Sequence, residues 1–346
     1  MKRPDSELTK VGELSLTKSL AKRYAPTRAK MKLLDQAAEL AAAPDDVDRA
    51  YMARQLVQCT LPHSDPKDGA IIWQRKSGGR SLVIQSGYDD EKGEYLGIPY
   101  GTIPRLLLFW LVTEANYRKN LPDLTDKQRR HIELGRSLAA FMRAVGLNPE
   151  TGGGKRGDAH RLRVQMLRLF SSRITFQGTV ETEETKGKIF KDMSVTTEYE
   201  LWWDVKSPGQ GTLFPSYLDL GEKFYDAITT MPVPFDLRAL RMLHRSPLAL
   251  DLYALLAYQA FAIVTNRRQP QFLSWTVLMR QLGTGISDTN NFKKKVQKEL
   301  RKVRLAYPGL AVESVRGGLS INASRLAVPR KTAGEATPPD GLKRPH

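Results

Sequence analysis

Side chains that could read DNA bases recur at helical spacing between Lys155 and Arg173. At 3.6 residues per turn, four apolar residues share one face of this segment: Leu162, Met166, Leu169 and Phe170. Four polar residues share the opposite face: Arg161, Gln165, Arg168 and Ser172. Arginine and glutamine can grip a guanine or adenine edge with two hydrogen bonds, and serine can reach phosphate. The segment is typical of a recognition helix, although a solvated amphipathic helix with ordinary surface arginines fits the same pattern.

The neighbouring residues indicate how such a helix would be positioned. Residues 137–146 predict a short apolar helix that ends at Gly146, and a turn rich in proline and glycine follows it. Lys155 and Arg156 begin the basic segment after this turn, and we expect both to contact DNA. Strand-like residues come after the segment: Ile174, Thr175 and Phe176. This order predicts a helix-turn-helix motif followed by a β wing.

The same pattern recurs later in the chain. Four residues of the first copy match four of the second at a constant offset: Ser137, Met142, Arg143 and Gly146 correspond to Ser274, Met279, Arg280 and Gly283. A second basic helix is predicted over residues 288–305, with an apolar face of Phe292, Val296, Leu300 and Val303. Its opposite face carries Asn291, Lys294, Lys295, Lys298, Arg301 and Lys302. Internal repetition is a signal that local propensity alone does not give.

The second basic helix is almost free of carboxylates. Only Glu299 interrupts the cations between Lys293 and Arg304. Like charges on one helix face repel, so a cationic face is locally unfavourable unless an anionic partner compensates it. Residues 311–315 and 319–322 flank an Arg-Gly-Gly turn and predict a two-stranded hairpin behind this helix. We therefore expect an α+β, mainly helical fold with two tandem winged-helix domains that carry β-hairpin wings.

Charge is the outlying property of the composition. The 346 residues contain 54 Lys and Arg against 37 Asp and Glu, a net charge of +17. Such a field attracts polyanions, either nucleic acid or an acidic membrane surface. An apolar content of 41% can support packed cores. The chain has no uninterrupted run of some 18 apolar residues and no apolar signal segment at its start, so we expect a cytoplasmic protein without a membrane partner.

Catalytic and metal-binding signatures were sought in the sequence. Cys59 is the single cysteine, and the five histidines are far apart, so neither a zinc site nor the metal site of a nicking enzyme has its ligands. Residues 152–156 resemble a phosphate-binding loop only superficially, because Pro149 and Arg156 stand where that motif needs a glycine and a serine or threonine. The sequence therefore predicts no enzyme, no cofactor and no metal.

The pattern along the chain divides it into five parts. Residues 1–50 are a basic N-terminal arm with one helix, which could be a mobile arm or could contact phosphate or a partner. Residues 51–206 form the first winged-helix domain, 207–234 a linker, and 235–330 the second domain. The first wing is expected from strands over 172–180 and 194–205, with a charged tip over 181–191. The last 16 residues, 331–346, predict a disordered tail.

Five short motifs resemble the plasmid-encoded replication initiators of the RepA type. The most specific is the block from Ile98 to Arg105, and the next is Thr151-Gly152-Gly153. The others are residues 61–66, Trp110 with residues 113–115, and residues 134–138. The similarity spans roughly residues 50–325. It implies a protein that binds repeated double-stranded sites at a plasmid origin, helps to open the duplex and recruits the host initiator and replicative helicase. It also implies a homodimer beside the monomer.

Three other functions fit some of these observations. A transcriptional repressor without a replication role would use the same DNA contacts. A nickase or primase would need metal-dependent cleavage or nucleotide incorporation, for which the sequence offers no ligand cluster. A basic protein that binds any polyanion would show no preference among duplexes. For the initiator, we expect the arginine-bearing helix to read bases and the lysine-bearing helix to bind phosphates.

Overall fold

The computed structural model describes residues 27–66, 69–77, 79–151, 157–181, 186–204, 206–282 and 285–329. The chain divides into two compact units, residues 1–43 and 44–346. The described part of the first unit is helix α2 (Arg28–Ala42), whose N-cap Thr27 accepts a hydrogen bond from the backbone of Lys30. Helix α2 lies in the N-terminal arm, where the sequence predicts a helix. Residues 1–26 of that arm and the expected disordered tail lie outside the described residues.

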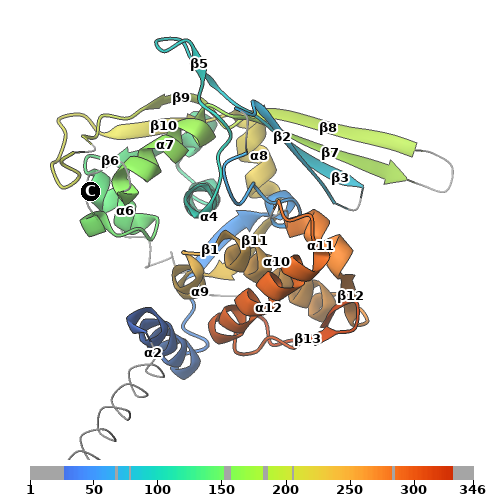
Figure 1. The fold of residues 1–346 in the computed structure, drawn as a ribbon. Coiled ribbons are helices and arrows are strands. Elements are labelled where there is room, and N and C mark those ends of the chain that lie inside the picture. Colours follow the sequence, from blue (N-terminus) through green and yellow to red (C-terminus); the bar gives the residue numbers. More distant parts are fainter. Residues whose placement is uncertain are drawn as a thin grey trace, which may run out of the picture. The chain divides into compact units, whose positions relative to one another are not determined.

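The second unit contains one order of elements twice (Figure 1). The first repeat consists of α4 (Thr102–Lys119), β6 (His131–Gly135), α6 (Leu138–Ala144), α7 (Asp158–Phe170), β9 (Thr196–Glu200) and β10 (Ser216–Leu220). The second repeat consists of α10 (Pro247–Thr265), β12 (Gln271–Ser274), α11 (Trp275–Leu282), α12 (Thr289–Ala306), β13 (Val312–Val315) and β14 (Gly318–Ile321). The antiparallel sheets have the orders β6-β10-β9 and β12-β14-β13, so the last strand is central in both. The fold is mixed α+β, and the sequence repeat corresponds to a structural one.

A third sheet is built around a hairpin inserted into the first repeat. Its four antiparallel strands are β2 (Ile72–Ser77), β3 (Arg80–Gln85), β7 (Arg173–Glu181) and β8 (Lys186–Ser194), side by side in Figure 1. The predicted pairing of residues 172–180 with 194–205 is wrong, because β7 pairs with β8 from Arg173 opposite Ser194 to Glu181 opposite Lys186. The strand that follows, β9, pairs with β10 instead. Propensity located the strands, but their partners depend on contacts between distant segments.

The remaining elements connect or cover the repeats. They are β1 (Arg49–Ala53), α3 (Arg54–Gln58), β4 (Tyr88–Asp89), β5 (Glu94–Tyr95), α5 (Asp126–Arg130), the 3-10 helix η1 (Pro149–Thr151), α8 (Glu222–Thr230), β11 (Pro232–Asp236) and α9 (Leu237–Leu243). Strands β1 and β11 pair antiparallel. The segment expected as a linker, residues 207–234, contains β10 and α8, so it is structured over much of its length. Where the domain boundary falls stays a prediction.

The two first helices of the repeats, α4 and α10, are apolar almost all round and mostly buried. Helix α10 is long and apolar enough to span a membrane, but most of it lies inside the protein, as in the core helix of a soluble fold. Phe235 of β11 packs edge-on against Phe109 of α4 at 5.4 Å between ring centroids, and 5.9 Å from Tyr253 of α10. One apolar core therefore continues from the first repeat into the second.

A buried ion pair joins the same two helices. Arg105 lies in the first turn of α4, and its Nε and Nη2 each donate to one carboxylate oxygen of Asp251 in α10, both at 2.7 Å. The guanidinium also donates to the carbonyls of Leu61 (2.6 Å), Pro62 (3.1 Å) and Gly101 (2.6 Å). All five of its N–H groups thus have an acceptor. We call Arg105 and Asp251 the interhelix clamp.

Two neighbouring residues complete the surroundings of the clamp. Gly101, the N-cap of α4, has φ of 81°, a left-handed conformation that favours glycine and that turns its carbonyl towards Arg105. His63 Nε2 lies 2.8 Å from Asp251 Oδ2. Burial raises the pKa of the Asp251 carboxyl, but Arg105 and His63 outweigh this and hold the pKa below its ordinary value. Asp251 is therefore a charged group that is buried with its partners.

Removing one member of the clamp should leave an uncompensated charge in the core. We expect Asp251→Ala to lower the free energy of unfolding by about 3–5 kcal/mol, because Arg105 would lose its counter-ion away from water. Urea unfolding followed by circular dichroism measures the change. Asp192→Ala, which breaks the exposed ion pair with Arg173 in the β7–β8 hairpin, is the control and should change stability little. Equal losses of unfolding free energy in the two variants would contradict the conclusion that the clamp is a buried ion pair that stabilises the fold.

The environment of His63 also predicts a pH dependence. Burial lowers the pKa of His63, and the hydrogen bond with Asp251 opposes this only in part. The folded state therefore takes up the proton less readily than the unfolded chain, so stability is lost as pH falls below about 6.5, the unfolded value. His63→Gln keeps a donor to Asp251 but cannot titrate, and it should lose less stability between pH 7 and pH 5. If the free energy of unfolding fell by the same amount in both proteins between pH 7 and pH 5, the predicted role of His63 would be disproved.

Candidate nucleic-acid interface

Helix α12 carries more positively charged side chains than any other described helix or strand. Its 18 residues hold seven Lys and Arg against a single Glu. The apolar residues Phe292, Val296, Leu300 and Val303 are buried, which turns the cationic face outwards. Asp288 caps the helix by accepting from the backbone of Asn291 at 2.7 Å. The helix therefore forms where the sequence predicted it, within one residue at each end.

The residues singled out on α12 divide into two groups. Asn291, Lys294, Lys295, Lys298 and Arg301 are exposed. Among the residues that the structure describes, none of these four cations is held in an ion pair. Lys302 is half-buried, and its Nζ lies 2.8 Å from Glu299 Oε2, so this charge is already compensated. The helix thus presents a cationic surface to solvent with little to neutralise it.

The helix before α12 is held in the manner of its counterpart in the first repeat. The Ser274 hydroxyl accepts from the backbone of Val277 at 3.2 Å, and the Ser137 hydroxyl accepts from the backbone of Ala140 at 3.4 Å. Ser137 lies two residues after β6, Ser274 is the last residue of β12, and each serine directly precedes a short helix. The matched serines of the sequence repeat are therefore helix caps at equivalent positions. Gly146 has a φ of 83° after α6. Its match, Gly283, lies outside the described residues.

Helix α7 offers fewer exposed polar side chains than its sequence predicts. Arg161 is the most exposed of the four that we expected on its outer face, at 54% of the side chain, and it pairs with Asp158 at 3.1 Å. Gln165 is only 6% exposed and Ser172 only 1%. The expectation that these two lie on the outer face is wrong. Their polar atoms are used inside the protein.

The interior partners of Gln165 and Ser172 explain their burial. Gln165 Oε1 accepts from the backbone N–H of Tyr100 at 2.9 Å, in the segment that leads into α4. The Ser172 hydroxyl donates to the Leu169 carbonyl at 2.7 Å, which satisfies an acceptor at the end of α7. A helical wheel places polar residues on the solvent side because it contains no information about neighbouring segments. Here a neighbouring loop supplies a backbone donor that needs an acceptor.

Arg168 is also tied to the protein. Its Nη1 donates to Asp65 at 3.2 Å and to the Ile98 carbonyl at 3.3 Å, and its side chain is 18% exposed. The guanidinium lies 5.2 Å from the centroid of the Tyr100 ring. A Cβ on Gly97 would come within 3.1 Å of this group, and Gly97 has a φ of 86°. Arg168 therefore anchors the segment before α4, and whether it also touches DNA stays a prediction.

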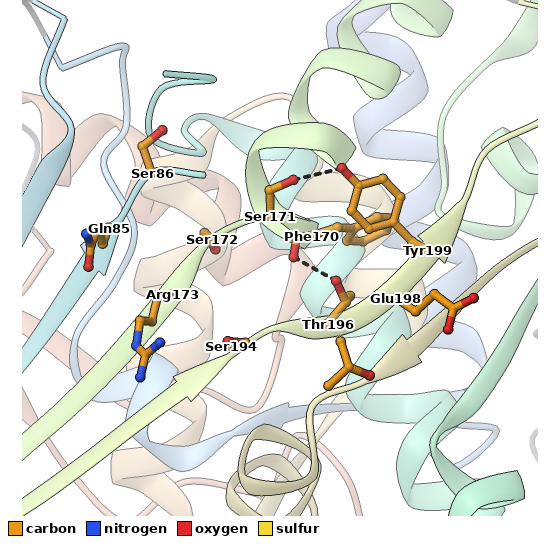
Figure 2. A pocket seen from close by; sticks show the side chains of 11 residues that line it. Gln85, Ser86, Phe170, Ser171, Ser172, Arg173, Ser194, Thr196, Glu198 and Tyr199 are labelled. Carbon is orange, nitrogen blue, oxygen red and sulfur yellow. Dashed lines mark hydrogen bonds between the residues drawn. The ribbon is translucent and has the colours of Figure 1, made fainter. Parts of the chain in front are cut away.

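A polar pocket lies where α7 ends, beside the starts of β7 and β9. Figure 2 shows the Ser171 hydroxyl bonded to that of Tyr199, and the Thr196 hydroxyl donating to the Phe170 carbonyl, both at 2.8 Å. Its charged groups are committed to neighbours, since Arg173 pairs with Asp192 and Glu198 accepts from Tyr217. The pocket therefore supports the junction of α7 with the inserted hairpin and offers no unpaired charge to a ligand.

Lys155 and Arg156 lie outside the described residues, so their role stays a prediction. Among the described residues, no group of three or more His, Cys, Asp or Glu side chains is placed to hold a metal ion.

The sequence reasoning did not identify the clamp as functional. A signal for it exists, because Arg105 and Asp251 are charges set among apolar residues, one near the start of each buried helix. Opposite charges at similar positions of two repeats favour a direct pair when both helices must be buried. In the sequence, Arg105 is the last residue of the motif from Ile98 to Arg105, and Asp251 lies within an apolar segment.

The model of a family described as plasmid encoded RepA protein matches residues 98–277. A crystal structure of selenomethionine derivatives of domains 2 and 3 of RctB is similar to this fold, with a TM-score of 0.47 and 14% sequence identity. The match covers 78% of this chain and 95% of that chain, and a likeness at this level carries no argument about function. A search of curated proteins found no significant match.

The burial of Gln165 predicts that removing its side chain destabilises the folded protein. Gln165→Ala should lower the free energy of unfolding by roughly 1–3 kcal/mol, because the Tyr100 N–H would lose its acceptor. Arg161→Ala, on the exposed side of the same helix, should stay within about 0.5 kcal/mol of the parent protein. Denaturant unfolding of both variants gives the comparison. A neutral Gln165→Ala variant would mean that the side chain is not held as described.

Proposed function

Because the chain belongs to the family of plasmid-encoded RepA proteins, we propose that it initiates plasmid replication by binding repeated double-stranded sites at the origin. The observation that carries the proposal is the exposed, largely uncompensated cationic face of α12. Four exposed cations on successive turns, without an ion pair among the described residues, match the phosphate charges along a DNA groove. Binding would release condensed counter-ions, so affinity should depend strongly on salt.

We further propose that each repeat is a winged-helix domain. The order helix, strand, helix, helix, strand, strand and the antiparallel sheet with its last strand central support this reading for both repeats. In it, α7 and α12 are the recognition helices, and the β9–β10 and β13–β14 connections are the wings. We place the first domain over residues 51–206, extended by β10, and the second over 235–330.

The two recognition helices should contribute unequally. Lysines act as point charges on phosphate, and α12 offers Lys294, Lys295 and Lys298 for this role with Arg301 beside them. On α7, Arg161 is the exposed arginine that can make a two-point base contact. We therefore expect α12 to supply most of the affinity and α7 to add sequence preference at fewer positions.

The remaining parts of the proposal rest on family membership. Opening of the adjacent duplex, recruitment of the host initiator and replicative helicase, and formation of a homodimer beside the active monomer are all proposed on that ground, as is a cytoplasmic, non-catalytic role. A transcriptional repressor with the same DNA contacts is the alternative. Permanganate probing of an origin plasmid with host proteins present separates the two, because only an initiator should expose unpaired thymines.

Footprinting on origin DNA across a salt series tests the assignment of the two helices. Lys298→Ala should weaken binding to all duplexes and reduce the slope of log K against log salt by about 1. Arg161→Ala should cost about 1–3 kcal/mol at the specific site and relax preference at one base. Lys92→Ala, which removes an exposed lysine between β4 and β5, is the matched control and should bind normally.

The pattern of protection decides between specific and general binding. Regularly repeated protected sites that survive moderate salt support the proposal. Uniform protection that vanishes with salt, in the parent protein as in the variants, would leave only a general affinity for polyanions, and the initiator assignment would then be withdrawn.

A further inference from the structure

The interhelix clamp connects the supports of the two recognition helices. Helix α7 packs on α4, and α12 packs on α10. Arg105 belongs to α4 and Asp251 to α10, so a direct path runs from α7 through the clamp to α12. Each step of this path is a helix or a buried side chain. A change in the clamp would therefore alter how the two outer helices are placed relative to each other.

The geometry of the clamp is directional. Two parallel N–H···O bonds of 2.7 Å fix both the distance and the plane between the guanidinium and the carboxylate. Apolar contacts such as those of Phe235 hold the repeats together, but they are not directional and permit small shifts. Three backbone carbonyls fix the guanidinium from the other side. Arg105 thus has one orientation in which all its donors are satisfied.

The loop that surrounds the clamp reaches α7 as well. His63 contacts Asp251, and Asp65, two residues further on, pairs with Arg168 of α7. One short segment therefore touches the clamp at one end and a recognition helix at the other. This second connection is independent of the packing of α7 on α4.

We propose that Arg105 and Asp251 are positioning residues that set the distance and angle between α7 and α12, and so the spacing of the base pairs that the two helices can contact together. The inference rests on the proposed function. A chain with a rigid clamp binds one spacing well, because both helices must enter successive major grooves about 34 Å apart. A chain without it keeps both contacts over a wider range of spacings.

The test compares spacing tolerance rather than affinity alone. Duplexes carry the protected origin repeat with one, two or three base pairs inserted between the parts assigned to α7 and α12. The parent protein should lose affinity about tenfold or more on these insertions, the equivalent of one two-point base contact. The double variant Arg105→Met with Asp251→Leu replaces the pair by apolar side chains of similar size, a change that is often neutral for stability. Its loss on insertion should be less than about threefold.

Two further variants keep the test decisive. Arg173→Met with Asp192→Leu removes an arginine–aspartate pair within one hairpin, so it should retain the spacing dependence of the parent. Arg105→Lys retains the buried charge but cannot make the planar two-point contact, and it replaces the double variant if that protein does not fold. Urea unfolding of every variant establishes which ones are folded.

The outcomes separate this inference from the proposed function. Protection of repeats by the parent protein, with an unchanged spacing dependence in the clamp variants, would overturn the positioning role and leave the origin-binding function standing. Binding by the parent protein that ignores insertions would also overturn it, since only one helix would then be reading. Absence of any protected repeat would remove the proposed function itself.

Discussion

The contact between Arg105 and Asp251 is the constraint on which the described second unit depends most. Two helices that are apolar on nearly every side are buried in the core that the two repeats share, and each carries one buried charged residue. Burying either charge alone would be costly, so the arrangement is favourable only when the two meet and every guanidinium donor finds an acceptor. The carbonyls of Leu61, Pro62 and Gly101 supply the remaining acceptors for the guanidinium.

The same constraint explains a motif whose purpose the sequence alone does not reveal. The block from Ile98 to Arg105 supplies the clamp arginine, a glycine in a left-handed conformation and a carbonyl that accepts from that arginine. It also supplies the Tyr100 N–H that binds Gln165 and the Tyr100 ring beneath Arg168. The block is thus a structural junction where α4, α7 and the loop after α3 meet. Its residues hold these elements in their relative positions.

The two repeats share a topology but differ in charge. Most cations of α12 are exposed to solvent. On α7, by contrast, Gln165 bonds to the backbone of Tyr100, and Arg168 pairs with Asp65. The inserted β7–β8 hairpin adds to the difference. It begins directly after α7 and pairs with β3, forming a four-stranded sheet that has no counterpart among the described residues of the second repeat. The two repeats therefore retain one topology while α7 and α12 present different charges to solvent.

Local patterns in the sequence determined the helices, the strands and their repetition. The apolar spacing of Phe292, Val296, Leu300 and Val303 located α12 and its outward cationic face, because a helix places those positions together whatever surrounds it. The matched serines at 137 and 274 indicated the repetition, and in the structure each accepts a hydrogen bond from the backbone at the start of a short helix. The similarity to RepA proteins was also present in short runs of residues, and the family match agrees with it.

Only the tertiary structure decided which strands pair, which polar side chains face inwards and how the repeats are joined. Whether β7 pairs with β8 or with β9 depends on backbone partners outside the segment, as does the burial of Gln165 beneath the Tyr100 N–H. Arg105 and Asp251 lie far apart in the chain, and neither residue specifies the other. Helical periodicity is a property of neighbouring residues, whereas the satisfaction of a buried charge is a property of whatever the fold brings against it.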